Sequence, residues 1–339
     1  MGKMRKRGKY MTYKWLHKPG LAVASSLLVA TSLIAVGGSI GTTVASASSK
    51  TFVVGLASEG FDASFPLAIA NGFKQQAAQD HVKTIVLNGN LTESTQEANV
   101  RTLIADHVDG IVIDVIEAVP TAAMVKLANA AHIPVMLVHG YAGSHYPPPV
   151  MSGVAFNIDE NEVGAGVEAG KLGLKADPAG GQVAIIEGTA GYQAVAQRAN
   201  GFTSVLKPTG KYTIVATQPG GWTSTIADSA CASILQAHPH VALFFAESDD
   251  MAEGCVTAIR AAKSTAKVIG IGGEKVFKSM IAKGEGYGTV CYEPFTEGQE
   301  VMTAMYKQLT GAAHYNRTMV FYNTPAVTRA NLNGCGWQW

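Results

Sequence analysis

The chain has 339 residues, of which 47% are hydrophobic and 15% charged, and its formal net charge is +1. Seven basic residues and no acidic residue lie within the first 47 positions, which leaves 19 basic and 25 acidic residues in the rest. A net charge near −6 for that larger part argues against nucleic acid or an anionic membrane surface as a partner. Its length suits two domains, each able to bury its own core.

The first 47 residues have the three parts of a secretory signal peptide. A basic segment precedes a mostly apolar run from Leu21 to Val36, and small residues end in Ala45-Ser46-Ala47. We expect cleavage after Ala47, which gives a mature chain starting at Ser48. The alternative is an uncleaved membrane anchor, for which the apolar run is short. In both cases the body of the protein lies outside the cytoplasm, in the periplasm or another extracytoplasmic location.

Apolar runs then alternate with helical patterns through the first half of the chain. Short runs rich in Val, Ile and Leu, bounded by Gly, Asn, Asp or Pro, predict buried strands at 52–56, 84–87, 110–113 and 134–138. Helical spacing covers the segments between them, 65–79, 94–105 and 119–131. Strands that alternate with helices of this length indicate βαβ units and a parallel sheet.

The second half repeats this scheme. Strands are predicted at 183–187, 213–217, 241–246, 267–271 and 287–291, and helices at 194–206, 224–236, 250–262 and 276–282. Ala-Asn-Gly-Phe at 70–73 recurs at 199–202, and Thr-Ile-Val at 84–86 recurs at 213–215, with the same offset of 129. Two matches at one offset, in the same place of the same βαβ pattern, predict two structurally similar lobes.

A further helix is predicted at 295–309 and a further strand at 318–322. The first half has one predicted strand fewer than the second, so this late segment is expected to return and complete the first lobe. The predicted fold is α/β, with two similar doubly wound parallel-sheet lobes joined by a three-stranded hinge. We expect the N-terminal lobe to comprise 48–155 plus 293–320, and the C-terminal lobe 156–292 plus 321–339.

Ligands of open parallel sheets bind beyond the carboxyl ends of the strands. This rule selects candidate positions in both lobes: 58–65, Asn88, Asp114, His139, 187–193, 218–222, 247–249, 272–274 and Tyr292. Asp249 is also placed to cap the helix that begins at Asp250. His139 is as compatible with an ordinary loop histidine as with a ligand contact.

Aromatic side chains at this edge favour a flat ligand. Trp222 follows Gln218-Pro219-Gly220-Gly221, a loop that offers it little to pack against, and Phe65 starts the first helix. Aromatic faces hold sugar rings and other planar ligands, although core packing is an equally good explanation for each residue.

The common sequence motifs of enzymes are absent or incomplete. The chain has no phosphate-binding loop of the Gly-x-x-x-x-Gly-Lys type, no Gly-x-Ser-x-Gly nucleophile elbow and no dinucleotide fingerprint. No nucleophile–base pair is visible, so we expect neither catalytic residues nor a cofactor.

Four cysteines, Cys231, Cys255, Cys291 and Cys335, suggest two disulfides in an oxidising compartment, with buried free thiols as the alternative. None has zinc-ligand spacing, so no metal site is expected. We expect the pair Cys231–Cys255 because their helices flank the third strand of the second lobe and are neighbours on one face of a 2-1-3-4-5 sheet. We also expect Cys291–Cys335, if the tail folds back on that lobe.

From about residue 51 to 325 the chain resembles the periplasmic ribose-binding and galactose-binding proteins. The matching segments are Phe65 with Asn71-Gly72, 98–100, 131–135, 197–202, 237–239 and 244–254. The resemblance implies two doubly wound lobes, three hinge crossings, and Phe65 and Trp222 on either side of a sugar. A signal peptide stands where a related repressor would carry its DNA-binding domain, which favours transport.

Polar positions depart from that family. The chain has Ala63, His139-Gly140, Ala196, Ser248, Gly272 and Tyr292 where the resemblance implies Asn, Asp-Arg, Arg, Asn, Asp and Gln. Loss of both arginines and both aspartates removes the bidentate partners of vicinal hydroxyls, so ribose itself is not expected as the ligand.

The chain is therefore expected to be a monomeric substrate-binding subunit of an ABC importer that delivers a sugar-like or other ring-shaped solute to a membrane permease. Phe65, His139, Trp222, Asp249 and Tyr292 are its candidate ligand contacts. A ligand sensor that docks to a receptor kinase and a secreted hydrolase of similar fold are the alternatives.

Overall fold

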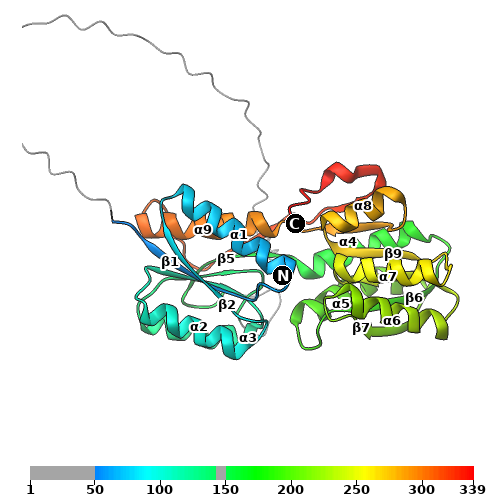
Figure 1. Ribbon diagram of the computed structural model, residues 1–339, viewed down its shortest axis with the longest axis horizontal. Helices are drawn as coiled ribbons and strands as arrows, with labels where there is room; N and C mark the ends of the chain where they lie inside the picture. The colour runs from blue at the N-terminus through cyan, green and yellow to red at the C-terminus, as the bar shows by residue number, and fades with distance from the viewer. Residues whose placement is uncertain (1–49, 143–149) are drawn as a thin grey trace, which may run out of the picture. The chain divides into compact units, whose positions relative to one another are not determined.

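The computed structural model describes residues 50–142 and 150–339, so the expected signal peptide and its cleavage site lie outside the described residues. The described part contains two six-stranded sheets with helices on their faces (Figure 1). The strand order is β11-β5-β4-β3-β1-β2 in the first sheet and β12-β10-β9-β8-β6-β7 in the second. The predicted fold class, two α/β lobes with mainly parallel sheets, is confirmed.

In the first lobe all pairings are parallel. Its strands are β1 (Val53–Ser58), β2 (Lys83–Asn88), β3 (Gly110–Asp114), β4 (Val135–Val138), β5 (Val154–Glu160) and β11 (Thr318–Tyr322). Its helices are α1 (Ser64–Gln79), α2 (Glu93–Ala105), α3 (Ala118–Ala130) and α9 (Pro294–Thr310). The strands β3 and β4 are buried along their whole length, as expected for a sheet covered on both faces.

The second lobe has the same construction, with one antiparallel strand added at the edge. Its strands are β6 (Gly181–Glu187), β7 (Tyr212–Pro219), β8 (Val241–Ala246), β9 (Lys267–Gly272), β10 (Gly288–Cys291) and β12 (Ala326–Thr328). Its helices are α4 (Glu162–Ala176), α5 (Gln193–Leu206), α6 (Ser224–Ala237), α7 (Asp249–Ala261) and α8 (Lys275–Lys283). Short 3-10 turns follow α5 at Lys207–Thr209 and β12 at Arg329–Gly334.

The repeated Ala-Asn-Gly-Phe motif lies at the same helix crossing in each lobe. In the first lobe Gly72 of α1 lies against the carbonyl of Phe295 in α9, and in the second Gly201 of α5 lies against the carbonyl of Val163 in α4. A Cβ atom at either glycine would overlap the neighbouring backbone. The repeat therefore encodes the close approach of one helix pair, which occurs once in each lobe.

Besides the 3-10 turns, three elements were not predicted from the sequence: the strand β5, the helix α4 and the short edge strand β12. The strand β5 and the helix α4 follow each other across the first crossing between the lobes. The strand β5 stays paired with β4 up to Ile158 and with β11 up to Glu160, so the first sheet extends beyond residue 155, where the crossing was expected. The strand β11 does return to the first sheet, as expected, and the chain then passes to β12 in the second sheet.

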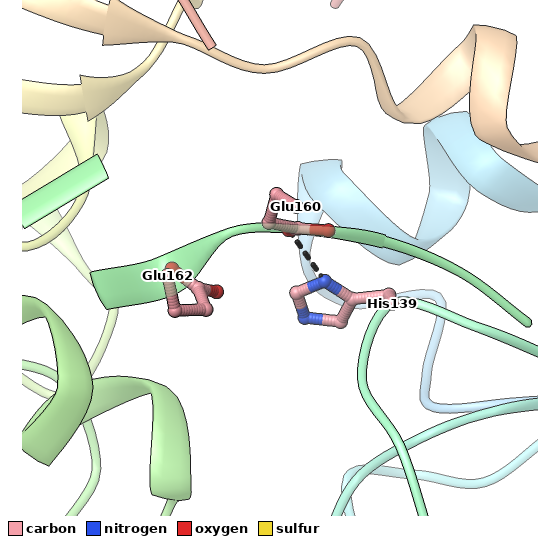
Figure 2. A group of neighbouring side chains, drawn as sticks. All are labelled: His139, Glu160 and Glu162. Atoms are coloured by element: carbon pink, nitrogen blue, oxygen red, sulfur yellow. Dashed lines mark hydrogen bonds and ion pairs between the residues drawn. The ribbon is translucent and has the colours of Figure 1, made fainter. Parts of the chain in front are cut away.

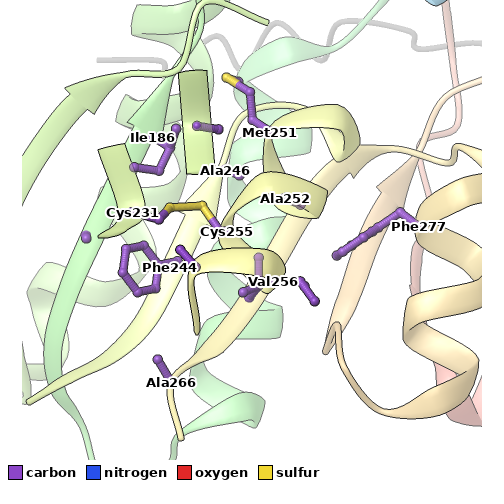
Figure 3. Packing of buried hydrophobic residues seen from close by; sticks show 14 of the residues in the cluster. Ile186, Cys231, Phe244, Ala246, Met251, Ala252, Cys255, Val256, Ala266 and Phe277 are labelled. Atoms are coloured by element: carbon purple, nitrogen blue, oxygen red, sulfur yellow. A yellow bond between two sulfur atoms is a disulfide. The ribbon is translucent and has the colours of Figure 1, made fainter. Parts of the chain in front are cut away.

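Both predicted disulfides are formed. Cys231 of α6 is bonded to Cys255 of α7, with Cα atoms 5.3 Å apart, and Cys291 of β10 is bonded to Cys335, with Cα atoms 5.6 Å apart. Figure 3 shows the first bond among the buried apolar side chains of the second lobe, next to Phe244. Among the described residues, no helix combines the length and the apolar character that crossing a membrane requires.

Candidate functional site

The carboxyl ends of strands from both sheets contribute side chains to one small cavity. Its volume is about 40 Å³, which suits one or two water molecules and is too small for a sugar ring. The cavity is lined by segments of the first lobe, of the first crossing and of the start of α5: Val115, Ile116, Ala118, His139, Gly140, Tyr141, Asp159, Glu162, Tyr192, Gln193, Ala194 and Gln197. A hydrogen bond of 2.9 Å from Gln197 Nε2 to Tyr141 Oη joins the two lobes at its edge.

Phe65, at the start of α1, lies among rings from other parts of the chain. Its ring centroid is 4.5 Å from that of His139, 6.1 Å from Tyr292 and 5.2 Å from Trp339. His139 directly follows β4 in the first lobe, whereas Tyr292 directly follows β10 at a crossing. The structure thus brings together three of the predicted contacts, Phe65, His139 and Tyr292, and adds Trp339, which the sequence analysis did not select.

His139 is held by a carboxylate of the first crossing. Its Nδ1 lies 2.7 Å from Oε1 of Glu160, as the dashed line in Figure 2 shows, and its side chain is 17% exposed. Burial alone would lower the pKa of His139, but the carboxylates of Glu160, Glu59 and Asp114 outweigh burial and raise it to about 10. The same pairing outweighs the burial of Glu160 and lowers its pKa to about 2. The pair is therefore charged at neutral pH.

A second buried ion pair joins α4 to α5. Arg198 donates from Nε to Oε2 and from Nη2 to Oε1 of Glu162, each at 2.6 Å, and from Nη1 to the carbonyl of Glu247 at 2.7 Å. The hydroxyl of Tyr292 donates to Glu162 Oε2 at 2.5 Å. Both charged residues are 5% exposed. This fork-to-fork geometry fixes the start of α4 exactly where the chain enters the second lobe.

Trp222 lies at the second-lobe side of this ion pair. Its ring is 5.5 Å from Cζ of Arg198 and 6.2 Å from the ring of Tyr192, while Arg198 Cζ also lies 5.2 Å from the ring of Tyr292. The guanidinium therefore sits between two aromatic rings. Arg198 connects Trp222 with the group of rings around Phe65.

Asp249 differs from the other predicted contacts, because its carboxylate is used within its own lobe. Oδ2 accepts from the backbone N–H groups of Gly273 and Glu274, at 2.6 and 2.9 Å, and Oδ1 accepts from Thr289 at 2.7 Å. The helix cap that the sequence assigned to Asp249 belongs to Ser248, whose Oγ accepts from the N–H of Met251. Asp249 thus fixes the loop after β9.

Carboxyl groups outnumber cations around the cavity. Asp114 ends β3, accepts from the backbone N–H of Glu59 at 3.1 Å and is fully buried. Burial, followed by the nearby charge of Glu59, raises the pKa of Asp114 to about 8. Among the described residues, neither its Oδ1 nor Oε1 of Glu247, which directly follows β8, has a hydrogen-bond partner. These two buried carboxyl oxygens, one at a strand end of each sheet, therefore keep acceptor capacity that no described group uses.

His139, Glu160 and Glu162 could also be taken for a metal site, because one ligand atom from each lies within 4.8 Å of the others (Figure 2). Both oxygens of Glu162 already accept from Arg198, and Glu160 is paired with His139. A guanidinium stays protonated and would repel a second cation. This group is better described as two linked ion pairs than as a metal centre.

Glu160, Glu162 and Arg198 were not selected in the sequence. Glu160 is the last residue of β5 and Glu162 is the first residue of α4, so the strand-end rule would have found them had this strand been recognised. Arg198 lies in α5 directly before the repeated Ala-Asn-Gly-Phe motif, at a position where the first lobe has Ile69. The side chains at the crossing were missed because the crossing strand was missed.

Known proteins match most of the chain. A family model described as a periplasmic binding protein domain matches residues 54–313. The ribose import binding protein RbsB of Bacillus subtilis is 27% identical over 249 residues, which cover 74% of this chain and 79% of that protein. RbsB of Escherichia coli is 25% identical over 248 residues, which cover 73% and 81% of the two chains.

Solved structures share the fold. A solute binding protein of an ABC transporter from Bacillus halodurans, with bound myo-inositol, has a TM-score of 0.78 at 18% identity and covers 85% of this chain and 98% of that chain. The binding component of the arabinose ABC transporter from Shewanella gives 0.76 at 22%, with 83% and 93% covered. The family model spans more than half of the sequence, and the two-lobed fold agrees with it, so the chain belongs to the periplasmic binding protein family.

Proposed function

We propose that this protein is the extracytoplasmic solute-binding subunit of an ABC importer, that it traps a sugar-like or other ring-shaped solute between its lobes, and that it delivers the solute to a membrane permease without converting it. The observation that carries the proposal is the meeting of aromatic and charged side chains from both lobes at the crossings, around a cavity too small for a sugar ring. A solute as large as a sugar ring can enter only if the two lobes move apart, as they do in proteins whose domains close around a ligand by a hinge motion.

The crossings carry the side chains that a bound solute would connect. His139 and Phe65 belong to the first lobe, Arg198 and Trp222 to the second, and Tyr292 lies between them. A solute that contacts both sets favours the closed form by its differential affinity, and a permease can then distinguish loaded from empty protein. The names of the relatives, which are import binding proteins and ABC transporter components, support this reading and give no support to the sensor alternative.

Ribose is not the solute we propose, although the curated relatives are named for it. The site holds no arginine at positions 140 and 196, and its remaining arginine is engaged by Glu162. We infer a solute held by ring stacking and by donation of its hydroxyl or N–H groups to buried carboxyls. We propose that the protein acts as a monomer after export and that its leader is removed after Ala47.

A thermal-shift screen tests the proposal with D-ribose, L-arabinose, D-allose and myo-inositol, followed by other polyols and aromatic acids. A binder at a hundred times its Kd stabilises the folded state by about 2.7 kcal/mol and raises the melting temperature accordingly. Trp222→Ala should weaken the binding of any hit about tenfold, since an aromatic contact adds roughly 0.5–1.5 kcal/mol beyond its buried area.

Tyr315→Ala is the matched control. Tyr315 packs on Phe156 with ring centroids 5.1 Å apart, near the start of β11 and β5 and thus at the sheet edge opposite the carboxyl ends. Its removal should leave affinity unchanged. Equal affinity in the parent and in Trp222→Ala would remove Trp222 from the site, and tight binding of ribose would contradict our reading of the missing arginines.

A further inference from the structure

The last residues of the sequence are anchored to the second lobe. Cys335 is bonded to Cys291 at the end of β10. Trp337 is 6% exposed, and its indole N–H donates to the carbonyl of Leu332 at 2.7 Å. Lys278 of α8 places its Nζ 5.3 Å from the centre of the Trp337 ring. A disulfide and a buried ring thus hold this tail, residues 335–339, in one position.

The tail also reaches the first lobe. Gln338 donates from Nε2 to Thr296 Oγ1 at 2.6 Å and accepts at Oε1 from the N–H of Thr296 at 3.2 Å. Thr296 belongs to α9, a helix of the first lobe. The backbone N–H of Lys275 donates to the carbonyl of Trp339 at 2.9 Å. The segment therefore bridges the two lobes beside the candidate site.

The indole of Trp339 fills space at the carboxyl end of β9. A Cβ atom at Gly272 would lie 3.2 Å from Cζ2 of Trp339 and 3.4 Å from the carboxylate of Asp249. On its other side the Trp339 ring meets Phe65 edge to face, with centroids 5.2 Å apart. The ring thus lies between the loop that Asp249 fixes and the aromatic group of the first lobe.

Within the part of the chain that the structure describes, the Trp339 Nε1–H group is buried and has no hydrogen-bond partner. Buried indole N–H groups in proteins usually find an acceptor, because leaving one unpaired is costly. In contrast, the indole N–H of Trp337, two residues earlier, is paired with a carbonyl. An unpaired donor beside Phe65 is therefore a feature that a bound acceptor would satisfy.

We propose that Trp339 is a ligand-binding residue, which the Cys291–Cys335 disulfide and the Trp337 anchor position as an additional wall of the cleft. The proposal rests on the proposed function, that the cleft binds a solute. It assigns to that solute an apolar ring face, which packs against Trp339 and Phe65, and a hydroxyl or ring oxygen, which accepts the indole N–H. Specificity at this edge then comes from the tail and not from a side chain at position 272.

Fluorine NMR tests the role of Trp339 directly. The sample is the exported protein, complete apart from the removed leader and labelled with 5-fluorotryptophan. Its tryptophans after the leader are Trp222, Trp337 and Trp339, so three resonances are expected, assigned by single Trp→Phe variants. The probes are L-arabinose, D-allose and myo-inositol. We expect the probe that binds to shift Trp222 and Trp339 and to leave Trp337, the internal control, in place. Trp339→Phe, which keeps a ring and removes the N–H, should weaken that binding up to about tenfold.

Each other result decides against the inference. A probe that shifts Trp222 but not Trp339 leaves the proposed function standing and overturns the role of Trp339. If no probe shifts either resonance, the inference fails together with the proposed solute class. Equal shifts of Trp337 and Trp339, with unchanged affinity in Trp339→Phe, would show that the tail moves as a unit and does not contact the solute, which also overturns it.

Discussion

Replacement of Arg198 by Met should destabilise the protein strongly, because it leaves the Glu162 carboxylate buried without its cation. In the parent protein Arg198 donates two hydrogen bonds of 2.6 Å to Glu162 and one of 2.7 Å to the carbonyl of Glu247, and the variant loses all three. Both partners are 5% exposed, so water cannot replace these bonds. Removal of one member of a buried ion pair costs about 3–5 kcal/mol in the free energy of unfolding.

A double-mutant cycle separates the pair from its surroundings. Glu162→Gln alone leaves a buried guanidinium facing an amide, which should cost a similar amount. The double variant leaves neither charge unpaired, so its loss should fall about 2–3 kcal/mol short of the sum of the single losses. Urea unfolding followed by far-UV circular dichroism gives these free energies, provided that the m-values of the variants agree.

The matched control is an exposed ion pair on the same helix. Lys171 and Glu168 of α4 lie 2.6 Å apart, but their side chains are 54% and 35% exposed. An exposed helix pair of this spacing couples by about 0.2–0.5 kcal/mol. If the coupling between Arg198 and Glu162 is no larger than that of the control pair, the buried pair does not hold the start of α4, and the argument is refuted.

Three further predictions concern the hinge histidine, a disulfide and the leader. His139→Gln should destabilise the protein more at pH 6.5 than at pH 10. The folded-state pKa of His139, about 10, lies above the ordinary 6.5, so the stabilisation from its charged pair with Glu160 is complete below pH 6.5 and is lost as the pH rises to 10. Equal losses of unfolding free energy in urea melts at both pH values would contradict this pairing. Replacing Cys231 and Cys255 by Ala should cost about 3–4 kcal/mol, since the bond closes a loop with a sequence separation of 24; calorimetry that shows no loss would refute it. N-terminal sequencing of the exported protein should begin at Ser48, and a membrane-bound product that begins at Met1 would contradict cleavage.

The lobes could be predicted because their signals are local. The strands β1, β3, β8 and β9 are mainly apolar and mostly buried, as expected of a parallel sheet covered on both faces. The disulfide between α6 and α7 followed from the order of the strands, since helices on one face of such a sheet are neighbours.

The first crossing could not be read in the same way. The strand β5 runs through Asn157 and Asp159, polar side chains that are buried in the structure and that break the apolar pattern of a strand. The helix α4 contains Gly164, Gly166, Gly170 and Gly173, which have poor helix propensity. Two of these glycines, Gly166 and Gly170, lie against carbonyls of α5, so tertiary packing explains a composition that local propensity disfavours.

The candidate site was harder to predict than the fold. Its side chains come from different elements, and positions that lack the side chain implied by the family resemblance lie next to side chains from elsewhere in the chain. Where the resemblance implies an arginine, the chain has Gly140, and the neighbouring His139 is paired with Glu160 of the crossing. Where it implies an aspartate, the chain has Gly272, and the Trp339 ring lies against that glycine. A sequence comparison made position by position shows only that the family's arginine is absent at 140 and its aspartate at 272. In three dimensions an indole fills the space beside Gly272, whereas a Cβ atom at Gly140 would meet Val115, and the charged pair lies at the preceding residue, His139. A ligand chosen by such a site must suit an imidazolium–carboxylate pair and aromatic faces, which is why the fold can be shared with ribose binders while the solute need not be.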